Sequence, residues 1–188
     1  MKQAELNFEF NQRHLLGLSD YSANDIRHVL EQAGQFRKIL DRPVPKVPTL
    51  RDKTIVNLFY ESSTRTRLSF ELAQKRMGAD VVNFSAKTSS TQKGESLKDT
   101  IRNIASMKID MVVVRHRSPG VPHFLTNCVD AAIINAGDGA HEHPTQALLD
   151  LFTMRQIYPD LTGKKIAIIG DIAHSRVVRS NVFGLIKL

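Results

Sequence analysis

Apolar and polar positions along the chain fall into blocks whose spacing predicts helices and strands in turn. The first block predicts a helix over residues 22–40, because its apolar positions recur every three or four residues. Ser22 and Asp25 have the spacing of a capping box, with Asp in place of the usual Glu. Three prolines follow Leu40, so we expect the helix to end there and a connector to follow.

From residue 54 onward, short and nearly continuous apolar runs alternate with amphipathic segments. The expected strands are 54–60, 81–85, 111–115 and 131–135. The expected helices are 64–77, 95–107, 121–127 and 144–158. Alternation of this kind predicts the α/β class, with a parallel βα sheet covered by helices on both faces. Ligands of such sheets bind outside the carboxyl ends of the strands.

A second unit begins near Gly163. The run Lys165–Ile169 predicts a buried strand, and a helix is expected over 175–188. One strand and one helix cannot bury a core of their own, so we expect the chain to stop early inside a second α/β domain. The predicted division is therefore a first domain over 1–150, a helix over 144–158 that bridges to the next domain, and the beginning of that domain over 161–188.

Composition narrows the function classes. The 188 residues are 41% hydrophobic and 24% charged, with a net charge of +7, as in a globular protein with a basic surface. A nucleic-acid binder would be expected to cluster Lys and Arg with stacking aromatics, and neither cluster is visible. A single cysteine excludes an internal disulfide and a Cys-based zinc site. With no apolar signal segment and no run of 18 apolar residues, we expect a cytoplasmic protein that does not bind a membrane.

The segment 62–68 carries the strongest chemical signal. It places hydroxyls and the guanidiniums of Arg65 and Arg67 between a predicted strand and a predicted helix. The free N–H groups of a helix start, together with Arg side chains, favour a phosphate or a similar dianion. The alternative is an ordinary capped helix with surface arginines.

Two further segments end predicted strands. Pro144 suits the first position of a helix, so His143 should stand at its cap, where it can donate to a carbonyl oxygen while Gln146 reads an amide. Residues 135–140 before it are expected to form a flexible turn. The pair Arg115-His116 follows another strand and is expected at the same edge of the sheet. Each of these has a plain structural alternative, a helix cap in one case and a solvent-facing strand end in the other.

Weaker signals complete the picture. His141 and His143 flank a Glu, but a third matched ligand is missing, so no metal site is expected. The polar loop 88–95 could close over a phosphate or be a plain loop. Residues 170–176 lack the Gly-x-Gly-x-x-Gly pattern of a dinucleotide site, and Arg176 near a helix start would instead suit a carboxylate.

Taken together and in this order, these segments resemble the aspartate carbamoyltransferases, within the aspartate/ornithine carbamoyltransferase superfamily. The resemblance runs from about residue 10 to the end of the chain, and it is carried by residues 59–71, 93–100, 114–116, 135–139, 143–150 and 170–176. Ser63-Thr-Arg-Thr-Arg67 is shared with the ornithine enzymes. Arg-His after the third strand, Lys-Gly-Glu in the loop and Asn-Ala-Gly-Asp-Gly before the His favour the aspartate enzymes.

The resemblance implies transfer of a carbamoyl group from carbamoyl phosphate to the amine of L-aspartate, an early step of pyrimidine synthesis, without a cofactor or an active-site metal. It implies that the phosphate is bound by Ser63, Thr64, Arg65 and Thr66. Arg115 would bridge the phosphate and the carbonyl oxygen, which Thr66 and His143 also face, and Gln146 would bind the carbamoyl amide. The implied catalytic residues are Arg65, Thr66, Arg115 and His143.

For the second substrate, the resemblance implies that Arg176 and Lys93 contact aspartate. Ser89 and Lys93 would reach the site from a neighbouring subunit, which implies a homotrimer with shared active sites, open to regulatory chains or a dihydroorotase partner. Further aspartate-binding residues of the family lie in a C-terminal half that this sequence lacks. The open alternatives are ornithine carbamoyltransferase, a non-catalytic carbamoyl-phosphate-binding or phosphate-binding paralogue or fragment, and a nucleic-acid binder whose affinity would fall steeply with salt.

Overall fold

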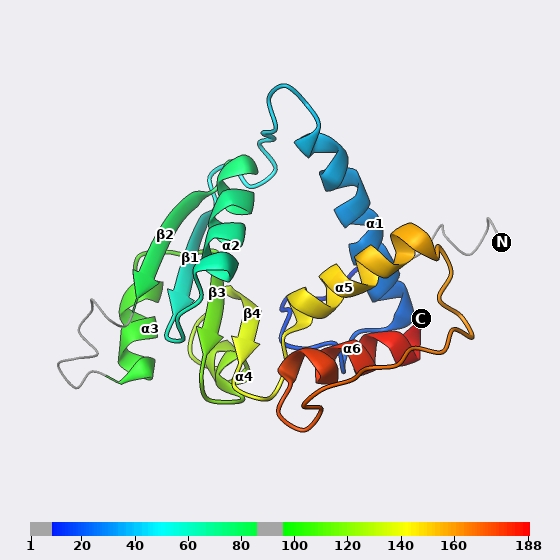
Figure 1. The fold of residues 1–188 in the computed structure, drawn as a ribbon. Coiled ribbons are helices and arrows are strands. Elements are labelled where there is room, and N and C mark those ends of the chain that lie inside the picture. Colours follow the sequence, from blue (N-terminus) through cyan, green and yellow to red (C-terminus); the bar gives the residue numbers. More distant parts are fainter. Residues whose placement is uncertain (1–8, 86–95) are drawn as a thin grey trace.

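A parallel sheet and a separate group of helices lie side by side in this chain (Figure 1). The computed structural model describes residues 9–85 and 96–188. In those residues the sheet has four strands in the order β2-β1-β3-β4, and all neighbours are parallel. The strands are β1 (Thr54–Phe59), β2 (Asp80–Ser85), β3 (Met111–His116) and β4 (Ala132–Asp138).

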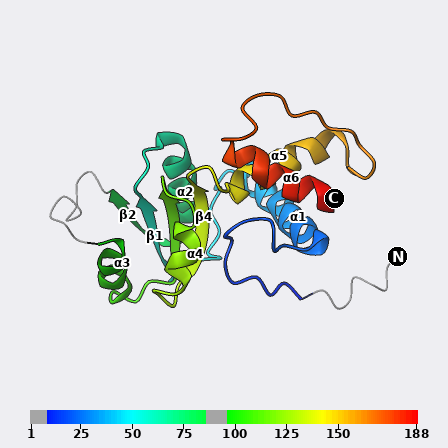
Figure 2. The same ribbon diagram turned by 90° about the horizontal axis from the view of Figure 1, so that it is seen from below.

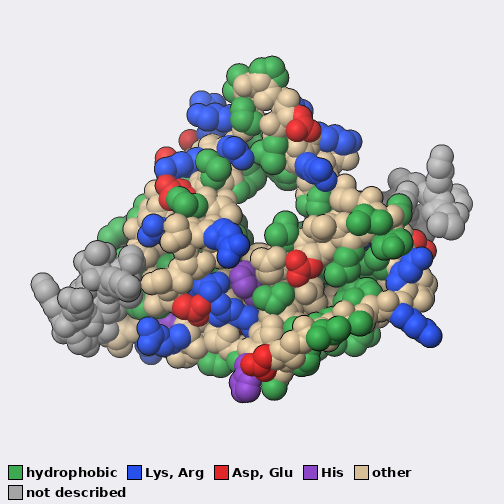
Figure 3. Space-filling model, in the orientation of Figure 1, with side chains coloured by type: hydrophobic (Ala, Val, Ile, Leu, Met, Phe, Trp, Pro, Cys, Tyr) green, Lys and Arg blue, Asp and Glu red, His purple; other side chains and the backbone are tan. Residues whose placement is uncertain are grey.

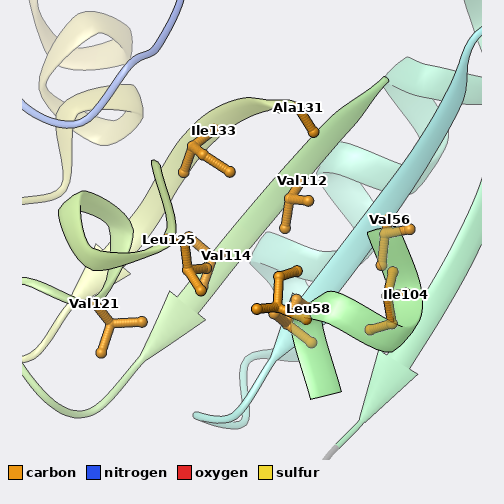
Figure 4. Close-up of a cluster of buried hydrophobic side chains, with 10 residues drawn as sticks. Val56, Leu58, Ile104, Val112, Val114, Val121, Leu125, Ala131 and Ile133 are labelled. Carbon is orange, nitrogen blue, oxygen red and sulfur yellow. The ribbon is translucent and has the colours of Figure 1, made fainter. Parts of the chain in front are cut away.

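Helices cover both faces of the sheet, as Figure 2 shows. The helix α2 (Thr64–Arg76) lies on one face, and α3 (Leu97–Ala105) and α4 (Val121–Thr126) lie on the other. Side chains of β1 alternate between the two, since Ile55 belongs to the core beside α2 while Val56 belongs to the core beneath α3 and α4 (Figure 4). Burial on both faces explains why the strands read as continuous apolar runs.

The second group consists of α1 (Ala23–Leu40), α5 (Pro144–Ile157) and α6 (Arg176–Lys187). Its core is formed by Leu18, Tyr21, Ile26, Leu30, Ala147, Leu148, Leu151 and Leu161. The capping box expected at Ser22 is present, with both of its hydrogen bonds formed. Because α5 starts directly after β4 and packs on α6, it carries side chains from the sheet edge into the helical group.

The N-terminal segment crosses to the far edge of the sheet. Leu15 forms a parallel bridge with Ile134 on β4. The Leu15 N–H donates to the Ile133 carbonyl at 2.9 Å, and the Asn135 N–H donates to the Leu15 carbonyl at 2.8 Å. Part of the outer edge of β4 is therefore paired with residues more than a hundred positions earlier in the chain.

The expected elements are confirmed within a few residues, with two corrections. Lys165–Ile169 is not a strand and is not buried, for Ile166 is 41% exposed and Ile169 is 95% exposed. In the described part of the chain no neighbouring strand pairs with it, and an extended segment without a partner cannot form a ladder. The apolar run at Lys165–Ile169 therefore predicted both a strand and burial wrongly.

The expected flexible turn at 135–140 is also wrong. β4 continues to Asp138, whose side chain is fully buried. The Asp138 carboxylate accepts from the Asn135 side chain at 2.9 Å, from the Gly120 N–H at 2.8 Å and from the Glu142 N–H at 3.1 Å. Those bonds hold the segment between β4 and α5 rigid.

The strand order creates the position for a site. From β1 the chain moves outward to β2 and then returns to the other side of β1 as β3. The order therefore reverses between β1 and β3, and the crevice beyond their carboxyl ends is where open α/β sheets bind ligands. The Tyr60 N–H donates to the Arg115 carbonyl at 2.9 Å, which joins the two strand ends at this point.

Candidate active site at the carboxyl edge of the sheet

The start of α2 lies directly beyond the carboxyl end of β1. Ser63 caps this helix, since its Oγ accepts from the Thr66 N–H at 3.4 Å and lies 2.9 Å from the Thr66 Oγ1. Thr64 and Arg65 are exposed in the first turn. The arrangement places hydroxyls, a guanidinium and helix N–H groups at one accessible point, as an anion site requires.

Arg115 is the residue before the last of the neighbouring strand β3 and is 9% exposed. One terminal nitrogen donates to the Ala136 carbonyl at 3.1 Å, and the other forms an ion pair with Glu61. Its Nε is buried and has no hydrogen-bond partner within the described residues. Burial first, and then the nearby Arg176, lower the pKa of Arg115 from its ordinary value.

Glu61 joins the two arginines of the site. Its carboxylate accepts from Arg176 at 3.0 and 2.8 Å, and it pairs with Arg115 as well. The hydrogen bonds from Arg176 and the charge of Arg115 outweigh burial and lower the pKa of Glu61. Both guanidiniums pack against Gly137, where a Cβ would lie 3.1 Å from atoms of each, and Gly137 has a φ of +111°. Any side chain at Gly137 would therefore crowd both arginines and strain the backbone.

His143 stands at the cap of α5, as expected, and is 7% exposed. Burial first, then the charges of Arg115 and Arg176, lower its pKa to about 4. The imidazole is therefore neutral near pH 7 and can donate through one ring nitrogen. The pKa of His143 therefore responds to both of the arginines that pair with Glu61.

The backbone of His143 is fixed by a buried carboxylate. The His143 N–H donates to the Ser180 Oγ at 2.9 Å, and the Ser180 hydroxyl donates to Glu142 at 2.9 Å. Glu142 is 1% exposed and also accepts from the Leu18 N–H at 2.9 Å. Three distant segments of the chain thus meet at one carboxylate directly beside His143.

Gln146 lies one turn after His143, on the same side of α5. Its Nε2 donates to Asp150 at 3.0 Å, and the Asn181 side chain of α6 donates to the other oxygen of Asp150 at 2.8 Å. The amide of Gln146 is therefore held by a chain of hydrogen bonds that ends on α6.

The structure brings together some of the expected site residues and leaves others apart. Arg115, Arg176 and His143 converge around Glu61. Ser63 and Thr66 contact each other, but no described contact joins Arg65 to the arginines of the sheet edge. The expected loop 88–95, with Ser89 and Lys93, lies outside the described residues.

His116 and His141, which stand beside expected site residues in the sequence, are engaged elsewhere. The ring of His116 contacts Tyr60 at a centroid distance of 5.2 Å, and its Nδ1 accepts from the Ser118 N–H. His141 pairs with Asp138. Among residues 9–85 and 96–188, no group of three or more His, Cys, Asp and Glu is arranged to hold a metal ion.

Charge gathers on this face of the molecule. Figure 3 shows a hollow between the sheet and the helical group, with Lys, Arg and His side chains around it. Two arginines and one carboxylate leave a net positive charge beside a neutral imidazole. Such a site can bind a dianion and donate hydrogen bonds to a neighbouring carbonyl oxygen.

No helix in the described part of the chain is long and apolar enough to cross a membrane.

Sequence reasoning missed Glu61, Glu142 and Asp150. One signal could have pointed to Glu61, because it directly follows a buried strand at the edge where two arginines were expected, and converging guanidiniums need a counter-charge. Glu142 and Asp150 carry no such signal. Their partners, Ser180 and Asn181, lie on a helix about 30 to 40 residues later in the chain.

Comparisons with known proteins point to one family. Residues 13–156 match the family model described as "Aspartate/ornithine carbamoyltransferase, carbamoyl-P binding domain". The chain is 59% identical over 175 residues to an aspartate carbamoyltransferase catalytic subunit of Cytophaga hutchinsonii, which covers 93% of this chain and 57% of that protein. A relative with the same name from Flavobacterium psychrophilum is 59% identical over 180 residues, covering 96% and 58% of the two chains.

Solved structures show the same likeness. The fold is similar to that of aspartate transcarbamoylase from Trypanosoma cruzi, crystallised with carbamoyl aspartate and phosphate, at 36% identity and a TM-score of 0.87, over 93% of this chain and 56% of that one. The catalytic subunit of M. Jannaschii aspartate transcarbamoylase is similar at 41% identity and a TM-score of 0.83, over 93% and 56% of the two chains. This chain spans 57% to 58% of the length of the curated relatives named above. The α/β fold, the sheet-edge site and these matches together show that the chain belongs to the aspartate/ornithine carbamoyltransferase family.

Proposed function

We propose that this chain belongs to an enzyme that transfers the carbamoyl group of carbamoyl phosphate to the amine of L-aspartate. The products would be N-carbamoyl-L-aspartate and phosphate, in the de novo synthesis of pyrimidines. The observation that carries the proposal is the convergence of Arg115, Arg176 and a neutral His143 beyond the carboxyl ends of adjacent parallel strands. The names of the relatives, aspartate carbamoyltransferase catalytic subunits, support the choice of reaction.

The phosphate half of the substrate is assigned to the start of α2. Ser63, Thr64, Arg65 and Thr66 offer hydroxyls, a guanidinium and helix N–H groups to its oxygens. Arg115 is assigned the position between phosphate and carbonyl, and its buried Nε, without a partner in the described chain, supports a ligand there. Each hydrogen bond to a charged group contributes about 1.5–3 kcal/mol.

The carbonyl oxygen is assigned to His143, Arg115 and Thr66. Negative charge grows on this oxygen when the amine nitrogen of aspartate attacks the carbonyl carbon. With a pKa of about 4, His143 donates as a neutral imidazole and keeps its proton throughout. Fixed donors aimed at such an oxygen are worth about 10²–10³ in rate each.

The remaining steps complete the balance of atoms. After the new C–N bond has formed, the bond between the carbonyl carbon and the phosphate oxygen breaks. Phosphate leaves with the bonding electron pair. We assign the amine proton to the departing phosphate. Gln146 binds the carbamoyl amide, while Arg176 and Lys93 are assigned to the carboxylates of aspartate. No cofactor or metal has a part in the proposed reaction.

A homotrimer with shared sites belongs to the same proposal, because Ser89 and Lys93 are assigned to the site of a neighbouring subunit. Mixing Lys93→Ala subunits with His143→Ala subunits tests this sharing. Each variant alone should be inactive, and hybrid trimers should regain activity because some of their sites contain neither substitution. Hybrids that stay inactive would contradict the sharing.

The location and the domain boundaries stay predictions. A cytoplasmic location is supported by the single cysteine, since intracellular proteins seldom depend on disulfides, and cell fractionation tests it. The division into a carbamoyl-phosphate-binding domain over 1–150 and the beginning of an aspartate-binding domain over 161–188 can be tested by limited proteolysis of the purified protein.

The reaction itself is tested with the purified full-length protein to which this chain belongs and with both amino acids. We expect the enzyme to carbamoylate aspartate and not ornithine. Turnover of ornithine instead would favour the ornithine carbamoyltransferase alternative. Turnover of neither amino acid would contradict both transferase proposals. Arg65→Ala should abolish the use of carbamoyl phosphate without loss of fold, since Arg65 is exposed. Arg51→Ala removes the same charge at the opposite end of β1 and is the matched control.

A further inference from the structure

Asp150 occupies a defined place between the substrate-facing side of α5 and the helix α6. Gln146 and Asp150 are four residues apart on α5, so their side chains share one face of the helix. One oxygen of Asp150 accepts from Gln146 at 3.0 Å, and the other accepts from Asn181 at 2.8 Å. Both oxygens of the carboxylate are therefore engaged by amides from two different helices.

The chemistry of this pair decides which end of the Gln146 amide faces outward. An ionised carboxylate can only accept hydrogen bonds. Gln146 must therefore turn its Nε2 toward Asp150, which leaves its Oε1 for a ligand. That oxygen accepts a hydrogen bond from an NH₂ group and gains nothing from a methyl group.

The side chain of Asn181 also donates to Asp150, and this orientation leaves its own oxygen without a partner among the described residues. It is 9% exposed, and its Oδ1 is buried without a hydrogen-bond partner in the described part of the chain. Leaving a buried acceptor unpaired is unfavourable. The amide nevertheless points its Nδ2 at Asp150, so the Asp150 carboxylate is held from α6 as well as from α5.

We propose that Asp150, held by Asn181, is the positioning residue that selects a carbamoyl group over an acetyl group of the same size by fixing the orientation of the Gln146 amide. The inference rests on the proposed function and adds to it the origin of the preference for NH₂ over CH₃. Asp150 acts through Gln146 and does not itself touch the substrate.

The test compares two stable, equally charged probes that differ only at the discriminating group. Phosphonoacetamide carries an amide NH₂, and 2-oxopropylphosphonate carries a methyl group in its place. Inorganic phosphate is the third probe, because it carries neither the NH₂ group nor the methyl group that Gln146 is proposed to distinguish. Dissociation constants are measured by calorimetry on the purified protein and its variants at one pH and salt concentration.

The unmodified protein should bind the amide probe about tenfold more tightly than the ketone probe, as expected for one hydrogen bond. In Asp150→Asn, the Asn181 Nδ2 would donate to the oxygen of the introduced amide. The nitrogen of that introduced amide would then face Gln146. The Gln146 amide would then have to reverse and present its own nitrogen, so the ratio should fall to about one or below. Phosphate affinity should change by less than about threefold.

Two further variants separate orientation from charge and from folding. Asn181→Ala keeps the charge of Asp150 and removes one anchor, so the ratio should fall by about two- to fivefold. Asp130→Asn removes the same charge at a side chain that is 92% exposed and should leave the ratio unchanged. If Asp150→Asn does not fold, as judged by circular dichroism, the Asn181→Ala result decides.

The outcomes distinguish the inference from the function beneath it. A wild-type protein that binds neither phosphate nor the probes overturns the proposed function and the inference together. Phosphate binding with equal affinity for the two probes, or a tenfold preference that survives both Asp150→Asn and Asn181→Ala, overturns the inference alone.

Discussion

The Glu61 carboxylate accepts hydrogen bonds from Arg115 at the sheet edge and from Arg176 of α6, and the contact with Arg176 is two-fold, at 3.0 and 2.8 Å. The two residues are 115 positions apart in sequence. Through this pair the first turn of α6 is tied to the segment between β1 and α2, directly beside the expected phosphate site.

Glu61→Gln should separate stability from anion binding. Loss of the charged hydrogen bonds should lower the free energy of unfolding by about 1–3 kcal/mol. Phosphate should bind about fivefold more tightly, because the carboxylate no longer competes for Arg115. Urea unfolding and calorimetry measure the two effects. Glu71→Gln, which removes the same charge from an i,i+4 pair on α2, should not tighten phosphate binding.

The same ion pair predicts a pH dependence. The pKa of Glu61 is lowered in the folded state, so its contribution to stability is present above its ordinary pKa of 4.5 and is lost as pH falls through the folded value. The difference in unfolding free energy between the unmodified protein and Glu61→Gln should therefore be largest above pH 4.5 and shrink below it. A difference that grows toward acid pH would contradict this assignment.

His143 predicts a second pH window. Its folded pKa of about 4 lies below the ordinary value of 6.5, so between these values the unfolded chain binds a proton that the folded chain does not. Stability should thus rise with pH across this window, by at most about 1.4 kcal/mol per pH unit, and level off above it. In His143→Gln this part of the slope should disappear from urea unfolding curves taken at pH 4.5 to 7.5. His174→Gln, at a side chain that is 80% exposed, is the control.

Gly17 and Glu142 should behave as a coupled pair. A Cβ at Gly17 would lie 2.2 Å from Oε1 of Glu142, and the other oxygen of this carboxylate accepts from the Leu18 N–H and the Ser180 hydroxyl. Gly17→Ala should therefore cost about 2–3 kcal/mol of stability in the unmodified protein. In a Glu142→Ala background the obstruction is gone and the cost should fall below about 1 kcal/mol. Additive effects in this double-mutant cycle would disprove the coupling.

A buried amide pair fixes α2 on the sheet. Asn57 and Gln74 exchange two hydrogen bonds at 2.9 and 2.8 Å, and both are almost fully buried. Gln74→Ala should lower the free energy of unfolding by about 2–3 kcal/mol, since it leaves the Asn57 amide short of partners. Gln74→Glu keeps the size of the side chain and an acceptor for Asn57, so it separates lost packing from lost bonding. A loss as small as that of an exposed Gln32→Ala would contradict the role of the pair.

The repeating pattern of the sequence was enough to predict the parallel sheet, because strands buried on both faces read as apolar runs and caps such as Ser22 mark where helices begin. It also located His143 and Arg115, since both follow predicted strands at one edge. The pattern could not predict Glu61 joining Arg115 to Arg176, because the pair depends on how α6 packs. Nor could the pattern predict that Lys165–Ile169 lies exposed. Burial of a strand depends on a neighbouring strand, and the local sequence does not show whether one is present.

The bridge between Leu15 and Ile134 has a consequence for the order of folding. A parallel sheet contains no local hairpin from which folding can start. Each pair of strands must therefore bear the entropic cost of closing a long loop before its stabilising contacts form. The loop closed by Leu15 spans more than a hundred residues, so its partner strand is made well after it. Residues around Leu15 therefore leave the ribosome before β4 and can pair with it only once β4 has been made.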